Sequence, residues 1–456
     1  MPGKIVSINP ATEEKIAEYE LLSLEKTLQE LEKTKKAFAE WKEFHVSERV
    51  QFLSKAGKIL RAKKQKYAEI MTNEMGKPIS QALAEVEKCA LACDFFAENA
   101  EKFLQNDLVK TEARKSYVAF QPLGNILGVM PWNFPFWQVF RFASSTLAVG
   151  NTVTIKHSSN VPGSALACEE VFQEAGLPEN VFKVLLIDSK TVEKIIPTNF
   201  VQGVSLTGST EAGRNVAQLS GQALKKTVLE LGGSDPFVVL DDVDVSHCAQ
   251  QAVQGRIVNS GQSCIAAKRF IVLESIVEEF TQKYLENMKN LRVGNPLEKE
   301  TQIGPMARKD LVDALDAQVK KSVKEGAKLL FGGKKIPGKG FFYEPTLLRN
   351  VTEKMTAFNE ETFGPVAGVI SAKDDEDAVR LANKTIYGLG GSVWSKNSDR
   401  AERIALRIDA GLLYVNDTVK TDPRLPAGGV KESGYGRELG KYSLYEFANL
   451  KTVVVK

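Results

Sequence analysis

The stretch from Asn259 to Arg269 holds one thiol, Cys264, among small and polar residues. No apolar residue crowds the sulfur from its N-terminal side, whereas the other four cysteines lie in apolar helical patterns, which are typical of buried thiols. A free thiol has a pKa of about 8.5, so a nucleophilic role requires a base, a helix terminus or a nearby cation. Taken alone, the stretch is compatible with an accessible nucleophile and equally with a loop cysteine that does no chemistry.

Two other stretches could supply the groups that a thiol nucleophile needs. In Pro131–Pro135, the side-chain amide of Asn133 lies between two prolines after a predicted strand, where it could donate to an oxyanion. In Leu229–Gly233, one carboxylate, Glu230, lies between apolar residues at a strand end, where burial would raise its pKa toward that of a general base. Both have structural alternatives, because Asn133 could cap a turn or helix and Glu230 could form an ion pair or cap.

Three further features indicate a nucleotide. The segment Leu206–Gly213 reads as strand, glycine turn and helix, so amides at the helix N-terminus could receive a phosphate, although the segment is neither a P-loop nor G-x-G-x-x-G. Glu361 could bind a ribose diol beside the aromatic Phe363, and Lys156, after a strand, could bind hydroxyls or phosphate. A plain strand-helix connection, a surface loop and an exposed lysine are the respective alternatives.

Length and composition limit the partners. A chain of 456 residues is expected to form two or three domains. Lys plus Arg number 60 against 57 Asp plus Glu, a net charge of +3 without a basic block, which argues against nucleic acid. Neither a membrane-length apolar run nor an apolar N-terminal segment is found, so we expect no membrane and a cytoplasmic location. The five cysteines show no spacing of a disulfide framework or metal site.

The surrounding elements read as helical scaffold followed by α/β structure. Apolar spacing predicts four helices in the first hundred residues: Leu24 to Trp41, one after Ser47, Tyr67 to Met75 and Ile79 to Phe96. Strands then alternate with helices, which predicts one parallel sheet over 125–232 and a second domain of similar type after it. The β-branched segment Leu450–Val455 has no local partner, so we expect it to pair with residues 116–121 or with another subunit.

Together these stretches resemble the aldehyde dehydrogenase superfamily, in the same order and over nearly the whole chain. The shared motifs are Pro-Trp-Asn-Phe-Pro at 131, Thr-Gly-Ser at 207, Glu-Leu-Gly-Gly at 230, Gly-Gln-x-Cys at 261 and Glu-x-Phe-Gly-Pro at 361. The resemblance implies two Rossmann-type open α/β domains plus a small β oligomerisation element. It implies a cofactor domain from 1–107 and 122–232, a catalytic domain over 233–425, and oligomerisation strands in 108–121 and 440–456.

The resemblance also implies a role for each residue. Cys264 would attack an aldehyde, Asn133 and the Cys264 amide would hold the oxyanion, and Glu230 would activate the water that cleaves the thioester. The residues implied at the cofactor are Trp132, Lys156, Ser159, Gly208, Ser209, Glu361 and Phe363. No metal is implied, and the expected assembly is a homodimer or homotetramer.

Two residues bear on cofactor and substrate choice. Many NAD-using relatives carry glutamate where this chain has Ser159, so a 2'-phosphate could lie between Ser159 and Lys156, and NADP is favoured over NAD. Arg141 lies two turns into the helix after Asn133, where it would suit an aldehyde with a distal carboxylate. Together with Trp137 and Thr421, it resembles the substrate residues of bacterial succinate-semialdehyde dehydrogenases. Alternatively, Arg141 only pairs with a surface acid.

The chain departs from the family pattern at two positions. Ala427 replaces a usual phenylalanine before Gly428-Gly429, and Glu432 lies where a basic residue is common. The first change leaves pocket size and loop order open, so a broader-specificity aliphatic aldehyde dehydrogenase is an alternative. A cofactor-independent thiol esterase is another, because it would use the same nucleophile and oxyanion donor. It would leave Lys156, Ser209 and Glu361 without a purpose.

Overall fold

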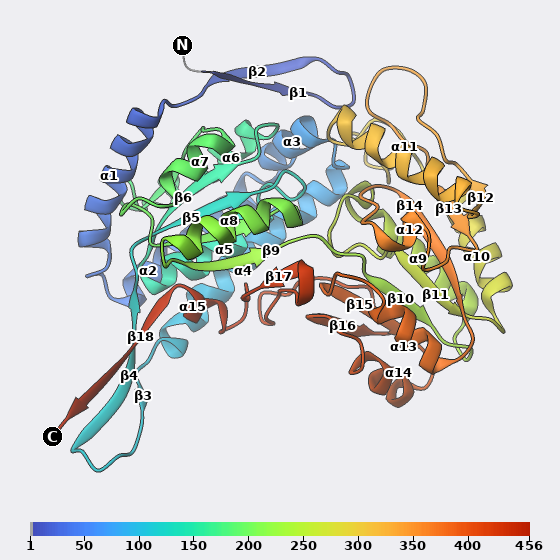
Figure 1. The fold of residues 1–456 in the computed structure, drawn as a ribbon. Coiled ribbons are helices and arrows are strands. Elements are labelled where there is room, and N and C mark those ends of the chain that lie inside the picture. Colours follow the sequence, from blue (N-terminus) through green and yellow to red (C-terminus); the bar gives the residue numbers. More distant parts are fainter. Residues whose placement is uncertain (1–2) are drawn as a thin grey trace.

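The computed structural model describes residues 3–456 as two α/β lobes and a projecting arm (Figure 1). The N-terminal hairpin, which the sequence analysis does not predict, pairs β1 (Lys4–Ile8) with β2 (Lys15–Glu20). It runs along the top of the first lobe toward the second, where the Phe341 N–H donates to the Pro10 carbonyl at 2.9 Å. The four predicted helices follow and are confirmed: α1 (Leu24–Trp41), α2 (Val46–Ala62), α3 (Lys64–Met75) and α4 (Ile79–Phe103).

The first lobe is built on a six-stranded sheet in the order β17-β9-β8-β5-β6-β7. Its bounds are β5 (Asn125–Met130), β6 (Thr152–His157), β7 (Phe182–Val184), β8 (Gly203–Thr207), β9 (Lys226–Glu230) and β17 (Gly434–Tyr435). Its helices are α5 (Trp137–Val149), α6 (Pro162–Glu174), α7 (Ser189–Ile195) and α8 (Thr210–Gln222). The predicted parallel sheet is confirmed, and the unpredicted β17 joins it antiparallel to β9, with Gly434 opposite Glu230.

The second lobe contains a seven-stranded sheet in the order β12-β13-β14-β11-β10-β15-β16, parallel except for β12. Its bounds are β10 (Pro236–Val239), β11 (Arg269–Leu273), β12 (Lys328–Phe331), β13 (Thr346–Arg349), β14 (Val366–Ala372), β15 (Gly390–Trp394) and β16 (Leu412–Val415). Its helices are α9 (Val245–Ile257), α10 (Val277–Lys289), α11 (Lys309–Lys324), α12 (Thr356–Asn359), α13 (Asp375–Asn383) and α14 (Ser398–Ala405). Two 3-10 segments follow α9 and precede β17: η1 (Val258–Gly261) and η2 (Lys431–Ser433).

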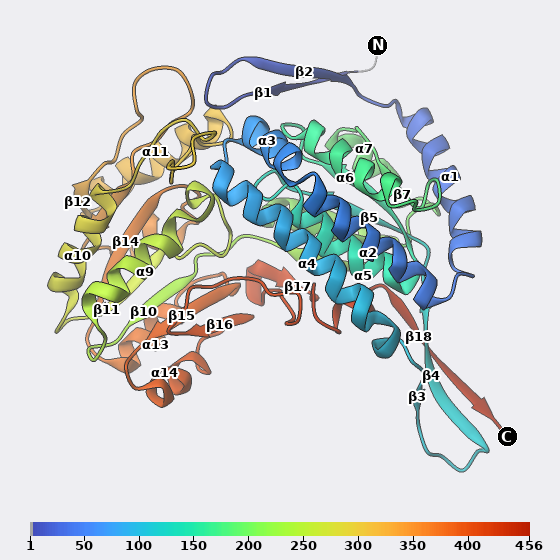
Figure 2. The ribbon, with the colours of Figure 1, turned by 180° about the vertical axis from the view of Figure 1, so that it is seen from behind.

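The arm extends away from the first lobe in both views (Figures 1 and 2). It consists of β3 (Asp107–Leu108), β4 (Lys115–Pro122) and β18 (Ala448–Val455), which α15 (Ser443–Glu446) precedes. β18 lies antiparallel to β4 along its whole length. The predicted pairing of the C-terminal strand with residues 116–121 is therefore confirmed. Across residues 3–456, no helix combines the length and the apolar character that a membrane crossing requires.

Candidate active site

The nucleophile turn, residues Val258–Cys264, leaves α9 along a strained backbone path. Asn259 and Ser260 have φ angles of 53° and 56°, and Gly261 follows with 77°. Left-handed conformations are unfavourable for residues with a Cβ atom and persist only where the surroundings over-determine them. The turn ends at Cys264, which is half-buried and lies on the wall of a cavity.

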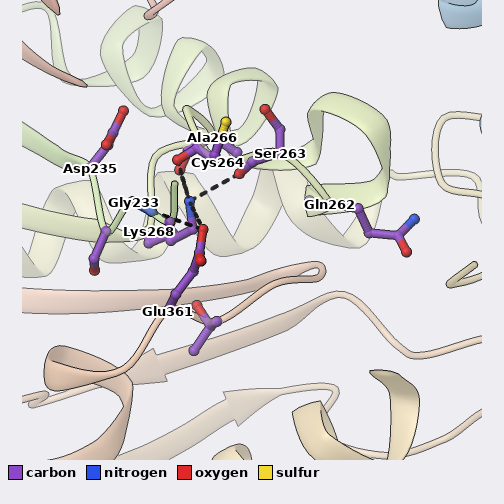
Figure 3. Close-up of polar contacts among 12 residues, drawn as sticks. Gly233, Asp235, Gln262, Ser263, Cys264, Ala266, Lys268 and Glu361 are labelled. Atoms are coloured by element: carbon purple, nitrogen blue, oxygen red, sulfur yellow. Dashed lines mark hydrogen bonds and ion pairs between the residues drawn. The ribbon is translucent and has the colours of Figure 1, made fainter. Parts of the chain in front are cut away.

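Two buried cations hold the nucleophile turn in this shape. The Lys268 ammonium donates to the carbonyl oxygens of Ser263, Cys264 and Ala266 at 3.0, 2.8 and 3.0 Å (Figure 3). The Arg256 guanidinium, on α9, donates to four carbonyl oxygens, those of Gly261, Ala267, Thr362 and Gly364. Burial lowers the pKa of Arg256 only to about 10, so the group is charged at neutral pH. The carbonyl oxygens that point inward from the turn therefore accept hydrogen bonds from charged donors. These bonds offset the cost of burying the carbonyl groups away from water.

Asn133 lies against the nucleophile turn. Its Nδ2 atom donates to the Gln262 carbonyl at 3.2 Å, and Asn259 Nδ2 donates to the Asn133 carbonyl at 2.7 Å. The side chain is 5% exposed. A carboxamide carries two N–H bonds, and the described chain engages only one of them, so the other can donate to an oxyanion beside Cys264.

A buried ion pair positions the loop that carries Asn133. Helix α5 lacks a side-chain cap of its own, and Glu85 Oε1 instead accepts from the Phe136 and Trp137 amides at 3.0 Å each. Lys77 pairs with Glu85 and places its ammonium 3.8 Å from the ring centroid of Phe134. The carboxylate thus caps the helix N-terminus, and the cation offsets its charge.

Glu230 is placed to act as a general base at the end of β9. Burial raises its pKa to about 7, against the opposing charge of Arg141, while Glu438 adds to the rise. Arg141 Nη2 lies 3.6 Å from Glu230 Oε2, and the same guanidinium pairs with Glu438. Glu230 Oε1 has no hydrogen-bond partner among the described residues. The carboxyl group is therefore partly ionised near neutral pH and has an oxygen that can accept a proton from water.

Cys264 is a neutral thiol at rest. Burial raises its pKa to about 12, and the nearby Glu361 and Glu230 add to the rise, while Arg141 and Lys268 oppose it. The thiol must therefore lose its proton as it attacks, and the two cations favour the developing thiolate.

One cavity of about 450 Å³ joins the nucleophile to most of the predicted cofactor residues. It lies at the carboxyl ends of β5, β6, β8 and β9, the usual ligand edge of a parallel sheet. Its lining includes Asn133, Cys264, Trp132, Lys156, Gly208, Ser209, Glu361 and Phe363. Ser159 lies exposed in the turn after β6, next to Ser158, which does line the cavity.

The lining fits a nicotinamide dinucleotide. Burial lowers the pKa of Lys156, and no described carboxylate forms an ion pair with it, so the site has a partly desolvated cation available for a phosphate or ribose. Ser209 caps α8, whose first amides remain available for an anion. Glu361 accepts from the Gly233 amide at 3.1 Å and lies 3.6 Å from the Lys268 ammonium, so its carboxylate is fixed at the cavity wall, where it could accept from a ribose diol. The Trp132 and Phe363 rings meet edge to face at 5.6 Å.

The predicted substrate residues do not line the cavity that contains Cys264. Trp137 lines a separate cavity of about 370 Å³, and Thr421 accepts a hydrogen bond from Lys88, which lines it too. Arg141 is 4% exposed and lies between two buried carboxylates. The sequence left open that Arg141 pairs with a surface acid. This alternative is wrong, because both carboxylates that Arg141 pairs with are buried.

The departures from the family pattern leave the loop ordered. Ala427 is almost completely buried, and its backbone exchanges two hydrogen bonds with Glu438, at 2.7 and 2.8 Å. Glu432 forms an ion pair with Arg214 at 2.8 Å. The missing ring at 427 thus does not disturb the backbone that carries Glu438.

Sequence reasoning assigned no role to six charged residues around the site. They are Lys77, Glu85, Lys88, Arg256, Lys268 and Glu438. Each contacts groups far away in the chain, and no local motif marks such a contact. The sequence signal that could have identified them is a charged residue among apolar neighbours, because a buried charge needs partners. Lys268, at the end of Ile-Ala-Ala-Lys, is an example.

Comparisons with known proteins agree with this geometry. A model of the aldehyde dehydrogenase family matches residues 2–453. A probable succinate-semialdehyde dehydrogenase (NADP(+)) of Synechocystis is 45% identical over 98% of this chain and 99% of its own length. A succinate semialdehyde dehydrogenase (NAD(P)+) of Escherichia coli is 43% identical over 98% and 97%. The solved structure of succinic semialdehyde dehydrogenase from Streptococcus pyogenes with NADP+ superposes with a TM-score of 0.97 at 35% identity, covering 99% of each chain.

Glu230→Gln tests the general base. We expect steady-state turnover to fall about 10²- to 10⁴-fold, while an initial burst of reduced nicotinamide persists, because only cleavage of the thioester needs the base. The base acts when deprotonated, so wild-type turnover should rise as the pH increases through about 7. The variant should not show this rise, which we call the pH limb of Glu230. The exposed Glu98→Gln is the matched control. A variant that keeps the limb would assign the base elsewhere.

Lys77→Met tests the buried ion pair. It leaves the Glu85 carboxylate without its cation, so we expect the free energy of unfolding to fall by about 3–5 kcal/mol, measured by denaturant titration. The double variant Lys77→Met/Glu85→Gln should recover part of this loss, because a neutral amide oxygen can still accept from the α5 amides. The exposed Lys102→Met serves as control. Absence of any recovery would contradict the electrostatic explanation.

Proposed function

The chain belongs to the aldehyde dehydrogenase family, and we propose that it oxidises succinate semialdehyde to succinate with NADP+ as the preferred acceptor and NAD+ as the alternative. The observation that carries the oxidation is that Cys264 lines the same cavity as Lys156, Ser209 and Glu361. A thiol esterase would need the nucleophile and the oxyanion donor, but it would not need residues for a dinucleotide in the same cavity. The lining therefore favours the dehydrogenase.

The reaction follows from the residues around Cys264. The half-buried thiol of Cys264 releases its proton to solvent water as the sulfur bonds to the aldehyde carbon, and the second N–H of Asn133 and the Cys264 amide hold the oxyanion that forms. The bound nicotinamide supplies the acceptor for the hydride that this carbon loses, which leaves a thioester on the sulfur. Glu230 then takes a proton from water, and the water oxygen attacks the thioester carbon. The C–S bond breaks and releases the acid, and the departing sulfur takes the proton from Glu230, which regenerates both the thiol and the carboxylate.

Several observations support a substrate with a distal carboxylate. The similar proteins from Synechocystis, Escherichia coli and Streptococcus carry names of succinate semialdehyde enzymes. Arg141 lies close enough to Cys264 to lower its pKa. Trp137 lines the second cavity, and Thr421 accepts a hydrogen bond from Lys88, which also lines it. We therefore assign Arg141, Trp137 and Thr421 to substrate binding, with Arg141 held by Glu230 and Glu438 until an anion arrives. An aliphatic aldehyde of broader range remains the alternative, because Ala427 is small.

Support for NADP comes from the turn after β6. Ser159 is exposed there and uncharged, next to the cavity that Lys156 and Ser158 line. A 2'-phosphate would meet a lysine and hydroxyls instead of a carboxylate.

We also propose the domain division and the assembly that the resemblance implies. Residues 1–107 and 122–232 would hold the cofactor, 233–425 would carry the nucleophile, and the strands in 108–121 and 440–456 would join copies into a homodimer or homotetramer. The arm exposes apolar side chains, including Leu108 at 76% and Val454 at 55%, which a second copy could cover. Cytoplasm is the proposed location, because all five cysteines are free and Cys264 must stay reduced.

A kinetic comparison tests the proposed substrate. Wild type should show a kcat/KM for succinate semialdehyde at least tenfold above that for butanal, which lacks the carboxylate. Arg141→Met should lower the first value more than the second and move the pH limb of Glu230 upward, because a positive charge that lowers its pKa is gone. The exposed Arg403→Met is the control. If Arg141→Met lowers kcat/KM equally for both aldehydes, Arg141 acts only through Glu230. If wild type shows no preference for succinate semialdehyde, the protein is an aliphatic aldehyde dehydrogenase of broader specificity.

Ser159→Glu tests the cofactor. We expect kcat/KM for NADP+ to fall at least tenfold relative to that for NAD+, because the new carboxylate repels a 2'-phosphate and can accept from a 2'-hydroxyl. Initial rates with each cofactor measure the ratio, and Ser246→Glu, on the exposed first turn of α9, is the matched control. A wild type that strongly prefers NAD+ would overturn the assignment.

A further inference from the structure

We propose that Lys88 is a specificity-determining residue that binds the distal carboxylate of the substrate together with the Thr421 hydroxyl. The inference rests on the proposed oxidation of a carboxylated aldehyde and adds a residue that no motif marks. Lys88 lies on α4 and lines the cavity of about 370 Å³, with Phe134, Trp137 and Val258 among its neighbours in the lining.

The cavity is placed to receive a substrate. Phe134 and Trp137 continue the loop that carries Asn133, while Ile257 and Val258 lead directly into the nucleophile turn. Both loops therefore run from this cavity to the reacting centre. A substrate whose aldehyde reaches Cys264 from this side would leave its other end near Lys88.

The Lys88 ammonium has no anionic partner. Nζ donates to Thr421 Oγ1 at 2.5 Å and lies 4.4 Å from the ring centroid of Trp137, and none of the described carboxylates lies within ion-pair distance. An ammonium offers three donors, so the hydroxyl leaves capacity for a carboxylate. A lysine with a purely structural role at such a site would be expected to pair with an acid.

The nearby acids are engaged elsewhere. Glu85, on the same helix, pairs with Lys77 and caps α5, and Asp422 pairs with Arg424 at 2.6 Å. Burial and the like charge of Arg141 lower the pKa of Lys88 to about 8, and this effect outweighs the attraction of the two carboxylates. The neighbouring Cys89 is a neutral thiol, because burial raises its pKa. Arg141 has Glu230 and Glu438 as counter-ions, whereas none of the described carboxylates pairs with Lys88, and an anionic substrate would supply that partner.

The test compares Lys88→Met and Lys88→Arg with the Lys102→Met control, which lies at the far end of α4. We expect Lys88→Met to lower the ratio of kcat/KM for succinate semialdehyde over butanal by about 10- to 100-fold, mainly through KM. Competitive inhibition by succinate should weaken in parallel. Lys88→Arg, which keeps the charge, should restore most of the ratio, and Lys102→Met should match wild type.

A pH series adds a second readout. Lys88 binds the carboxylate when protonated, so the wild-type ratio should fall as the pH rises through about 8, and Lys88→Arg should keep a high ratio across this range. Using the ratio cancels the titration of Glu230 and Cys264, which both aldehydes share.

The outcomes separate the two proposals. If wild type prefers the carboxylated aldehyde and Lys88→Met keeps that preference, or lowers kcat/KM for both aldehydes equally, the assignment of Lys88 is overturned while the proposed function stands. If wild type itself shows no preference, the proposed substrate fails before any variant is made, and the role of Lys88 fails with it.

Discussion

The geometry of the active centre depends on hydrogen bonds that two buried cations donate to backbone carbonyl oxygens pointing into the protein. The nucleophile turn takes three successive left-handed residues, and this path directs several backbone oxygens into the protein. Lys268 and Arg256 meet these oxygens, and Arg256 also binds the backbone at Thr362. The Cys264 turn and the loop of Glu361 are thereby held by the same two cations.

A second constraint is that Arg141 lowers the pKa of both Glu230 and Cys264, the proposed base and nucleophile. It opposes the rise in pKa of Glu230 that burial causes, and it favours the thiolate of Cys264. Glu438, which β17 and its flanking loop bring back to the first lobe, fixes the guanidinium. Because the base and the nucleophile share one cation, their protonation states are linked, and an anionic substrate near Arg141 would act on both.

The second cavity differs from the nucleophile turn in how its buried cation is paired. Around the nucleophile turn, each buried cation has carbonyl or carboxylate partners. At the second cavity, Lys88 has a hydroxyl and an aromatic ring. Incomplete pairing of this kind is unfavourable in the free protein and is relieved by a ligand of opposite charge, which is a means of discriminating between aldehydes.

The sequence by itself was sufficient for the order of most elements and for the α/β class. It also led to the proposal that Cys264, Asn133 and Glu230 react, because each lies at a strand end or glycine turn with a local pattern. It also indicated that the last strand needed a partner. Only the tertiary structure decided that β17 returns to the first sheet, that Lys77 and Glu85 support the Asn133 loop, and that Arg141 lies between two buried acids. These contacts join residues up to several hundred positions apart, and periodicity carries no information about such pairs. Lys88 was not predicted for the same reason. Its proposed role depends on the cavity that it lines, on the Trp137 ring beside it and on the lack of an ion-pair partner among the described carboxylates.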